Sequence, residues 1–205
     1  MRIAIACAAL AACTSSTDPY RLDHAQILAV RSEPAHVAAG GSVRIDALIG
    51  DDSGAVSVVV PDSVEVDGYA VTRAGDGWYV QSSPSLPVAP TATAAVTIDG
   101  AIWLATKQLD FADDRPNPTI AAMQVDGAAA ETIAAAPHAP ATLAAEVAVD
   151  GTASYAWYAS FGSLERYRSS EATFESDRSD TGTVALVVRD DQGGVAWLTL
   201  PAAVP

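Results

Sequence analysis

The chain has 205 residues, half of them hydrophobic but few aromatic, and a formal charge of −14 at pH 7. So acidic a surface repels phosphates, which excludes nucleic acids as partners and disfavours anionic lipid headgroups. Alanine and valine supply much of the apolar content, so cores of small and β-branched side chains are expected.

Residues 1–12 contain one positive charge, at Arg2, followed by an uninterrupted apolar run. The run is too short to cross the roughly 30 Å hydrocarbon core of a bilayer as a helix. A basic start, a short apolar run and small residues at its end are typical of a secretory signal peptide. The sequence therefore predicts that residues 1–12 are a signal peptide and are removed.

The end of this run, Leu10-Ala11-Ala12-Cys13, resembles the lipobox of bacterial lipoproteins. The resemblance implies cleavage before Cys13, a diacylglyceryl group on its sulfur, and a fatty acid such as palmitate on its new amino group. Two or more acyl chains hold a protein firmly on a membrane. The membrane is then a partner through the lipid on Cys13, the location is the cell envelope, and Thr14 favours the outer membrane. The alternative is an ordinary secretory peptide that is cleaved elsewhere.

Cysteine usage bears on stability. The only other cysteine, Cys7, lies within the predicted signal peptide, so the mature chain has no thiol pair and no internal disulfide. Its stability must come from buried apolar surface and strand pairing.

Residues 13–24 are polar and carry Pro19, which predicts a tether between the lipid and a folded domain. From Gln26 onward, short apolar segments alternate with turns rich in Gly, Asp and Pro, a pattern typical of β-strands. Ser42–Ile49 alternates with a period of two, with Leu48 as the one apolar residue on its polar side. The pattern predicts a half-buried strand there.

A first β-sandwich domain is predicted over residues 25–111. Its strands are expected at Ile27–Val30, Ser42–Ile49, Val56–Val60, Val64–Val66, Trp78–Gln81, Ala95–Ile98 and Ala101–Leu109. Residues 82–93 carry three prolines and are predicted to lie outside the sheets.

Charge and proline concentrate just after this domain, which predicts a linker at 112–118 and a second domain at 119–205. Its strands are expected at Thr119–Val125, Thr142–Val149, Ser154–Ser160, Ala172–Glu175, Thr183–Arg189 and Val195–Ala202. Asp150-Gly151 indicates a hairpin, because both central residues of a type I′ turn need φ > 0. The alanine-rich segment 128–136 leaves one or two helical turns open.

Thr183–Arg189 and Val195–Leu200 flank a Gly-containing turn and predict a long terminal hairpin. With Tyr155-Ala156-Trp157 upstream, this unit resembles the immunoglobulin-like and PKD-type domains of bacterial envelope proteins. The resemblance implies an all-β fold of two immunoglobulin-like β-sandwich domains, with Trp157 packed between two sheets. Trp197 is assigned to the core as well.

Residues for catalysis are scarce. His24, His36 and His138 lie in the predicted tether or beside prolines, without histidine or cysteine partners at zinc-ligand spacing, and are interpreted as surface residues. No serine lies in a Gly-x-Ser-x-Gly elbow, and no Gly-rich loop precedes a helix. The sequence therefore predicts no enzymatic activity and no cofactor.

Acidic residues near the linker, Asp110, Asp113 and Asp114, are candidate calcium ligands, because Ca²⁺ prefers several oxygen ligands at about 2.3 to 2.6 Å. Aspartate is also a preferred turn residue, because its side chain hydrogen-bonds its own backbone. The turn role is the favoured interpretation, and no metal site is predicted.

Aromatic residues offer a second kind of site. Trp78 and Tyr79 are candidate binding residues that would stack on sugars or on a partner protein. Because adjacent strand residues point to opposite faces, one ring of such a pair is expected in the core.

We therefore expect a lipid-anchored cell-envelope protein that is a non-catalytic structural or interaction module, with an envelope protein or a glycan as its partner. One alternative is a carbohydrate-binding or adhesion module that uses exposed aromatics or calcium. Another is a glycosidase-like enzyme, which needs two carboxylates about 5 to 10 Å apart in a pocket.

Overall fold

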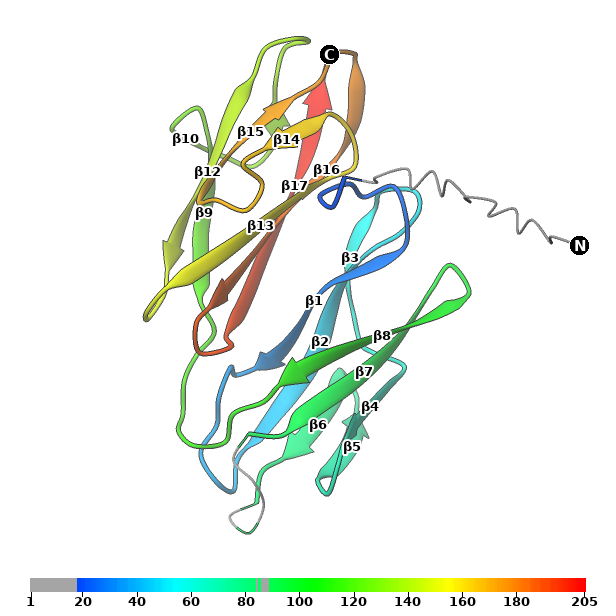
Figure 1. Ribbon diagram of the computed structural model, residues 1–205, viewed down its shortest axis with the longest axis vertical. Coiled ribbons are helices and arrows are strands. Elements are labelled where there is room, and N and C mark those ends of the chain that lie inside the picture. The colour runs from blue at the N-terminus through cyan, green and yellow to red at the C-terminus, as the bar shows by residue number, and fades with distance from the viewer. Residues whose placement is uncertain (1–17, 84, 86–88) are drawn as a thin grey trace, which may run out of the picture.

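A computed structural model describes residues 18–83, 85 and 89–205. Regular structure in this part of the chain is β-strand, arranged as two β-sandwiches that follow one another along the long axis (Figure 1). The N-terminal sandwich lies at the bottom of that view and the C-terminal sandwich at the top. The predicted signal peptide and Cys13 lie outside the described residues, so both stay predictions.

The first sandwich has two facing sheets with the strand order of an immunoglobulin domain. One sheet has the order β1-β2-β6-β5, with β3 also pairing β2, and the other has the order β4-β7-β8. These orders correspond to the ABED and CFG sheets of an immunoglobulin domain, with β3 as an additional strand between B (β2) and C (β4) in the chain. The strands are β1 (Gln26–Glu33), β2 (Ser42–Gly50), β3 (Val56–Val59), β4 (Ser63–Val66), β5 (Ala70–Ala74), β6 (Gly77–Gln81), β7 (Thr91–Ile98) and β8 (Ala101–Gln108).

The second sandwich repeats this order. Its sheets are β10-β9-β12-β15-β14 and β11-β17-β16-β13, and the short β11 pairs in parallel with β17. The predicted all-β fold of two immunoglobulin-like sandwiches is confirmed. The strands are β9 (Thr119–Val125), β10 (Ala128–Ala130), β11 (Ile133–Ala134), β12 (Ala141–Ala148), β13 (Ala153–Ala159), β14 (Ser163–Glu165), β15 (Glu171–Glu175), β16 (Asp180–Asp190) and β17 (Val195–Val204).

Each sandwich has its own core between its two sheets. Because successive side chains of a strand point to opposite faces, each strand contributes every second residue to that core. In β7 the buried row is Ala92, Ala94, Val96 and Ile98. In the second sandwich Trp157 is fully buried between the sheets, as predicted, and its Nε1 donates to the Ser169 carbonyl oxygen at 2.9 Å.

The exclusion of residues 82–93 from the sheets was wrong at its C-terminal end. β7 begins at Thr91, whose partner is Gln108, immediately after Pro90. Proline interrupts pairing only at its own position, so a strand can begin directly after it. The short strands β5 and β14 were not predicted, because they lie at sheet edges and lack a long apolar row.

The predicted hairpin at Asp150-Gly151 is also wrong. Only Gly151 has positive φ, and the turn joins β12 to β13, which lie in different sheets. Type I′ backbone occurs instead at Asp99-Gly100, between the paired strands β7 and β8, where both residues have positive φ. The segment 128–136, left open above, forms β10 and β11.

The tether prediction is wrong for the described residues 18–22. Tyr20 and Leu22 are buried, and Arg21 forms a parallel bridge with Ala159 at the end of β13. Two main-chain bonds hold this segment, from the Leu22 amide to the Ala159 carbonyl and from the Ala159 amide to the Tyr20 carbonyl, at 3.1 and 2.9 Å. A polar sequence with two apolar residues therefore docks onto the second sandwich.

Candidate functional site

The junction between the two sandwiches contains a third apolar cluster, separate from both cores. It forms between the outer faces of sheets, where Leu48 of β2 and Val187 of β16 are fully buried. The cluster consists of Leu22, Leu28, Ala29, Leu48, Ala185, Val187 and Val195, with Val56, Ala156, Tyr158 and Trp197 packed against it. These strands are therefore buried on both faces.

Trp197 belongs to this junction, so its assignment to a sandwich core was wrong. Its ring is only partly buried and lies under the guanidinium of Arg31, 4.1 Å from the ring centroid. Arg31 in turn binds both carboxylate oxygens of Asp46, at 3.1 and 2.7 Å. Trp197 faces outward on β17 because only the other row of that strand points between the sheets.

Polar side chains add bonds between the two sandwiches around the apolar cluster. Arg189 donates to the Leu28 carbonyl at 2.8 Å. Asn117 donates to the Ser32 carbonyl and accepts from the Val195 amide, both at 2.8 Å, so its single amide group ties both sandwiches.

Lys107 of β8 is buried at the same junction and donates to the Gly193 carbonyl in the turn between β16 and β17. Burial lowers the pKa of its ammonium from 10.5 to about 8, and the nearby Asp190 carboxylate opposes that shift. A hollow of about 300 Å³ lies beside it, between β1, β8 and the β16–β17 turn.

His36, interpreted from sequence as a surface residue, is 3% exposed and lies at this junction. Its Nε2 is 2.7 Å from the Gln192 carbonyl oxygen, and its Nδ1 is 3.2 Å from Asp113 Oδ1 and 4.0 Å from Asp110 Oδ2. The hydrogen bond with His36, helped by Arg115, lowers the pKa of the Asp113 carboxyl. Sequence reasoning named Asp110 and Asp113 but missed His36, because it lies more than seventy residues before them.

Main-chain bonds hold this group together. The His36 amide donates to the Arg115 carbonyl at 3.1 Å, and the Val37 amide donates to the Asp110 carbonyl at 3.2 Å. Of the three calcium candidates, Asp110 and Asp113 therefore lie together beside His36. Asp114 turns away and accepts from the Ala38 amide at 2.8 Å.

The candidate binding pair Trp78 and Tyr79 lies on β6, with one ring on each face. Trp78 packs against the first core and donates from Nε1 to the Pro61 carbonyl at 2.7 Å. Tyr79 is half-buried on the outer face, where its hydroxyl donates to Asp76 Oδ1 at 2.8 Å. Tyr79 is thus the ring of the pair on the outer face, and its hydroxyl is engaged with Asp76.

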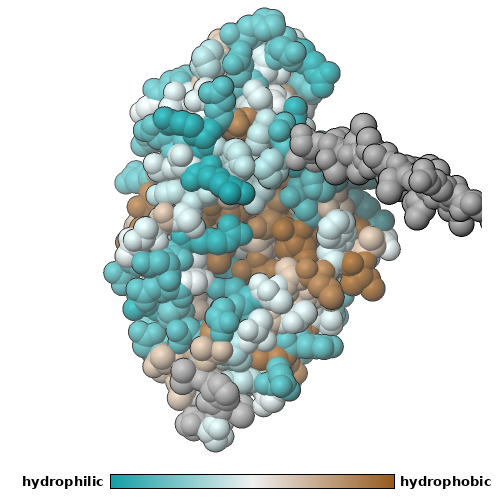
Figure 2. All heavy atoms as spheres, in the orientation of Figure 1, coloured by the Kyte–Doolittle hydropathy of each residue, from teal (hydrophilic) through white to brown (hydrophobic). Residues whose placement is uncertain are grey.

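The first sandwich also exposes apolar side chains. Ile102 and Leu104 of β8 are 73% and 69% exposed, and Trp103, Val58 and Val60 are exposed as well. In Figure 2, hydrophobic spheres gather on the first sandwich just below the junction. β8 also ends the sheet order β4-β7-β8, so it presents a strand edge among the described residues.

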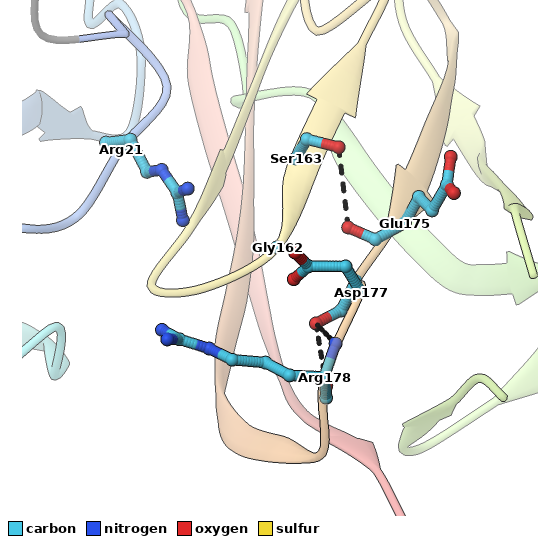
Figure 3. A pocket seen from close by; sticks show the side chains of 7 residues that line it. Arg21, Gly162, Ser163, Glu175, Asp177 and Arg178 are labelled. Carbon is cyan, nitrogen blue, oxygen red and sulfur yellow. Dashed lines mark hydrogen bonds between the residues drawn. The ribbon is translucent and has the colours of Figure 1, made fainter. Parts of the chain in front are cut away.

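A polar hollow of about 540 Å³ lies on the second sandwich, away from the strand rows that form its core (Figure 3). Arg21 of the docked segment and Arg178 line it together with the acidic residues Glu175 and Asp177. The hollow is open, and basic and acidic side chains share its lining, so no single charge dominates it.

No protein-family model matches the chain, and no curated protein matches it. Among solved structures it is similar to a chimeric titin Z1Z2 tandem, with 15% identity, a TM-score of 0.39, and coverage of 88% of this chain and 99% of that one. It is also similar to the Ig1-2 module of the Drosophila receptor protein tyrosine phosphatase DLAR, with 12% identity and a TM-score of 0.37. That match covers 89% of this chain and 99% of the module. The match to fibronectin(III)-like modules of Clostridium thermocellum CbhA has 11% identity and a TM-score of 0.33, and it covers 88% of this chain and 93% of that one.

These values carry no functional argument, and the assignment of two immunoglobulin-like sandwiches rests on the strand order given above. The described part of the chain contains no helix with the length and apolar character needed to cross a bilayer.

Proposed function

We propose that the chain is a lipid-anchored cell-envelope protein, held through Cys13, whose two sandwiches together form a non-catalytic structural or interaction module. The observation that carries the proposal is the apolar junction, in which Leu48 and Val187 are fully buried between the sandwiches. Domains joined by small polar contacts usually move relative to one another, whereas an apolar interface restricts such motion. A restricted pair suits a protein that spaces or presents a surface.

The docked segment supports an anchor close to the folded part. Four residues lie between Cys13 and Asp18, the first described residue. Five extended residue steps span at most about 17 Å, so a lipid on Cys13 would keep Asp18 within that distance of the membrane surface. In this proposal the sandwiches lie near the outer membrane instead of at the end of a long linker.

The interaction surface in this proposal is the exposed part of β8. Ile102, Trp103 and Leu104 are apolar, exposed and located on a strand that ends its sheet. Unpaired strand edges with apolar side chains bind extended peptide segments by adding a strand. A segment of another envelope protein is the partner that this chemistry favours over a glycan.

The anchor is tested with Cys13→Ala and a palmitate analogue fed to cells that express the full chain. The unchanged protein should take up label and fractionate with the outer membrane. Cys13→Ala should lose the label and the membrane association, because its side chain lacks the sulfur that accepts the lipid. Cys7→Ala is the matched control and should behave like the unchanged protein. Label on Cys13→Ala, or an unlabelled parent chain, contradicts the anchor.

A further inference from the structure

The tautomer of His36 is set by a group outside its own cluster. Its Nε2 lies 2.7 Å from the main-chain carbonyl oxygen of Gln192, which belongs to the other sandwich. A carbonyl oxygen only accepts hydrogen bonds, so Nε2 carries a proton and donates it. In a neutral imidazole, Nδ1 then holds the lone pair.

The Nδ1 atom of His36 faces two carboxylates. Nδ1 lies 3.2 Å from Asp113 Oδ1 and 4.0 Å from Asp110 Oδ2, and the His36 side chain is 4% exposed. Three acceptors that face one another repel unless a cation lies between them. The structure thus requires either a second proton on His36 or a metal ion at this point.

The distances suit a metal ion. The three ligand atoms all lie within 4.8 Å of one another. Zinc bonds of about 2.0 to 2.1 Å in a tetrahedral site separate the ligand atoms by about 3.3 Å. The His36–Asp113 separation already has this value, and Asp110 needs only a small side-chain adjustment.

Each ligand is also oriented by a second group, as ligands in metal sites usually are. The Asp110 Oδ1 atom accepts from the Ala112 amide at 2.8 Å, which leaves Oδ2 to face Nδ1. The Asp113 Oδ2 atom lies 3.6 Å from Arg115 Nη2, which leaves Oδ1 to face Nδ1. Arg115 also binds Asp150, at 3.1 Å.

We infer that His36 Nδ1, Asp110 Oδ2 and Asp113 Oδ1 bind a divalent transition-metal ion, with zinc as the best match. One buried imidazole and two carboxylates are zinc ligands, whereas calcium takes oxygen ligands. The two carboxylate charges balance the ion. This site differs from the set of calcium candidates named from sequence, because it includes His36 and leaves out Asp114.

The ion would connect three segments that are distant in the sequence. His36 lies in the connection between β1 and β2, the aspartates follow β8, and Gln192 lies in the turn between β16 and β17. Zinc at Nδ1 would strengthen the hydrogen bond from Nε2 to Gln192, because metal binding makes the other ring N–H more acidic. The metal site therefore stabilises the contact between the sandwiches, whether or not Cys13 carries a lipid.

The test is calorimetric titration of zinc into the full chain carrying Cys13→Ala, at about pH 7.5, because metal ligands bind in their deprotonated forms. We expect one equivalent of zinc to bind and the melting temperature to rise. Asp110→Asn and Asp113→Asn should each weaken binding by at least about tenfold. These side chains are 38% and 55% exposed, so both variants can fold even if His36→Ala does not.

The matched control is His24→Ala. His24 also faces an aspartate, with Nδ1 2.8 Å from Asp23 Oδ1, but both side chains are about half exposed. This variant should bind zinc like its parent. Nitrogen NMR should place the metal on Nδ1 of His36.

Each of the following outcomes overturns the inference: no zinc uptake, uptake unaffected by Asp110→Asn and Asp113→Asn, uptake lost in His24→Ala, or binding of calcium in place of zinc. If NMR shows both ring nitrogens of His36 protonated in the presence of zinc, a proton and not a metal ion lies between His36 and the aspartates, which also overturns the inference.

Discussion

At the scale of single residues, the junction depends on polar side chains that bind main-chain atoms of the opposite sandwich. Arg189 binds the Leu28 carbonyl, and Lys107 binds the Gly193 carbonyl. A buried polar group that loses its partner costs about 1 to 3 kcal/mol, so such bonds select one arrangement of the two sandwiches. The sequence shows these residues only as isolated charges.

Lys107 makes the stability of the protein depend on pH in a defined window. Its pKa is about 8 in the folded chain, against 10.5 ordinarily. Between these values the unfolded chain binds more protons, so the free energy of unfolding should rise as the pH increases from about 8 to 10.5. Lys107→Met lacks this contribution. Urea unfolding of both proteins across the window should show the parent gaining stability relative to Lys107→Met.

Lys107→Arg provides the control for this pH effect. A guanidinium stays charged throughout the window, so this variant should also lack the gain. An equal pH dependence in all three proteins contradicts the assignment to Lys107.

At the scale of elements, the same dipeptide forms different turns because the strands around it differ. Asp99-Gly100 joins two paired strands and adopts type I′ backbone, whereas Asp150-Gly151 crosses from one sheet to the other. Local preference allows positive φ at such residues, but strand pairing decides whether a hairpin forms. The turn sequence alone therefore predicted a turn at Asp150-Gly151 but not that the chain crosses there to the other sheet.

Gly54 and Gly100 separate the cost of backbone strain from that of crowding. Their φ angles are +81° and +79°, so alanine is strained at both. A Cβ on Gly100 meets nothing within 4 Å, whereas one on Gly54 would lie 2.6 Å from Ser160 Cβ in the second sandwich. Gly100→Ala should cost about 1 to 2 kcal/mol of unfolding free energy, and Gly54→Ala should cost more, as measured by urea unfolding.

Ser160→Gly in the Gly54→Ala background removes the crowded Cβ and should recover part of the excess loss. Equal losses in Gly54→Ala and Gly100→Ala, with no recovery, mean that the sandwiches are not in contact at Gly54.

At the scale of the whole molecule, two sandwiches with separate cores pack against each other through a third cluster that their outer faces share. β16 illustrates the consequence, since every residue from Val184 to Val188 is buried. A strand with only one buried face would alternate. The docked segment around Leu22 completes the cluster.

Leu48→Asp tests this junction. Leu48 is fully buried there, and a carboxylate at that position has no described partner, so the sandwiches should separate while their cores stay folded. Small-angle X-ray scattering should show a larger radius of gyration. Val58→Asp is the matched control, because Val58 is the cross-strand partner of Leu48 and is 54% exposed. A Leu48→Asp profile identical to that of Val58→Asp contradicts the coupling of the sandwiches.

Much of the fold was predictable, because alternation in segments such as Ser42–Ile49 indicates which side chains face the core of their own sandwich. Trp157 was placed correctly through the resemblance to immunoglobulin-like domains. The junction left a weaker signal. Leu48 interrupted the alternation of its strand, and this irregularity marks the residue that faces the second sandwich. The acidic residues Asp110 and Asp113 stood out in the sequence, but His36 left no signal as their neighbour, since pairing between distant segments brings them together.

The sequence by itself determined the fold class and most of the strands, because these depend on residues close together in the chain. The anchor at Cys13 rests on the sequence alone and stays a prediction. The tertiary structure alone decided that segment 18–22 docks, that Trp197 lies between the sandwiches, and that His36 meets two aspartates. The physical reason is that an outward-facing side chain is exposed or buried according to what packs on it. A period of two shows which residues share one face of a strand, but it carries no information about what packs on the outer face of the sheet.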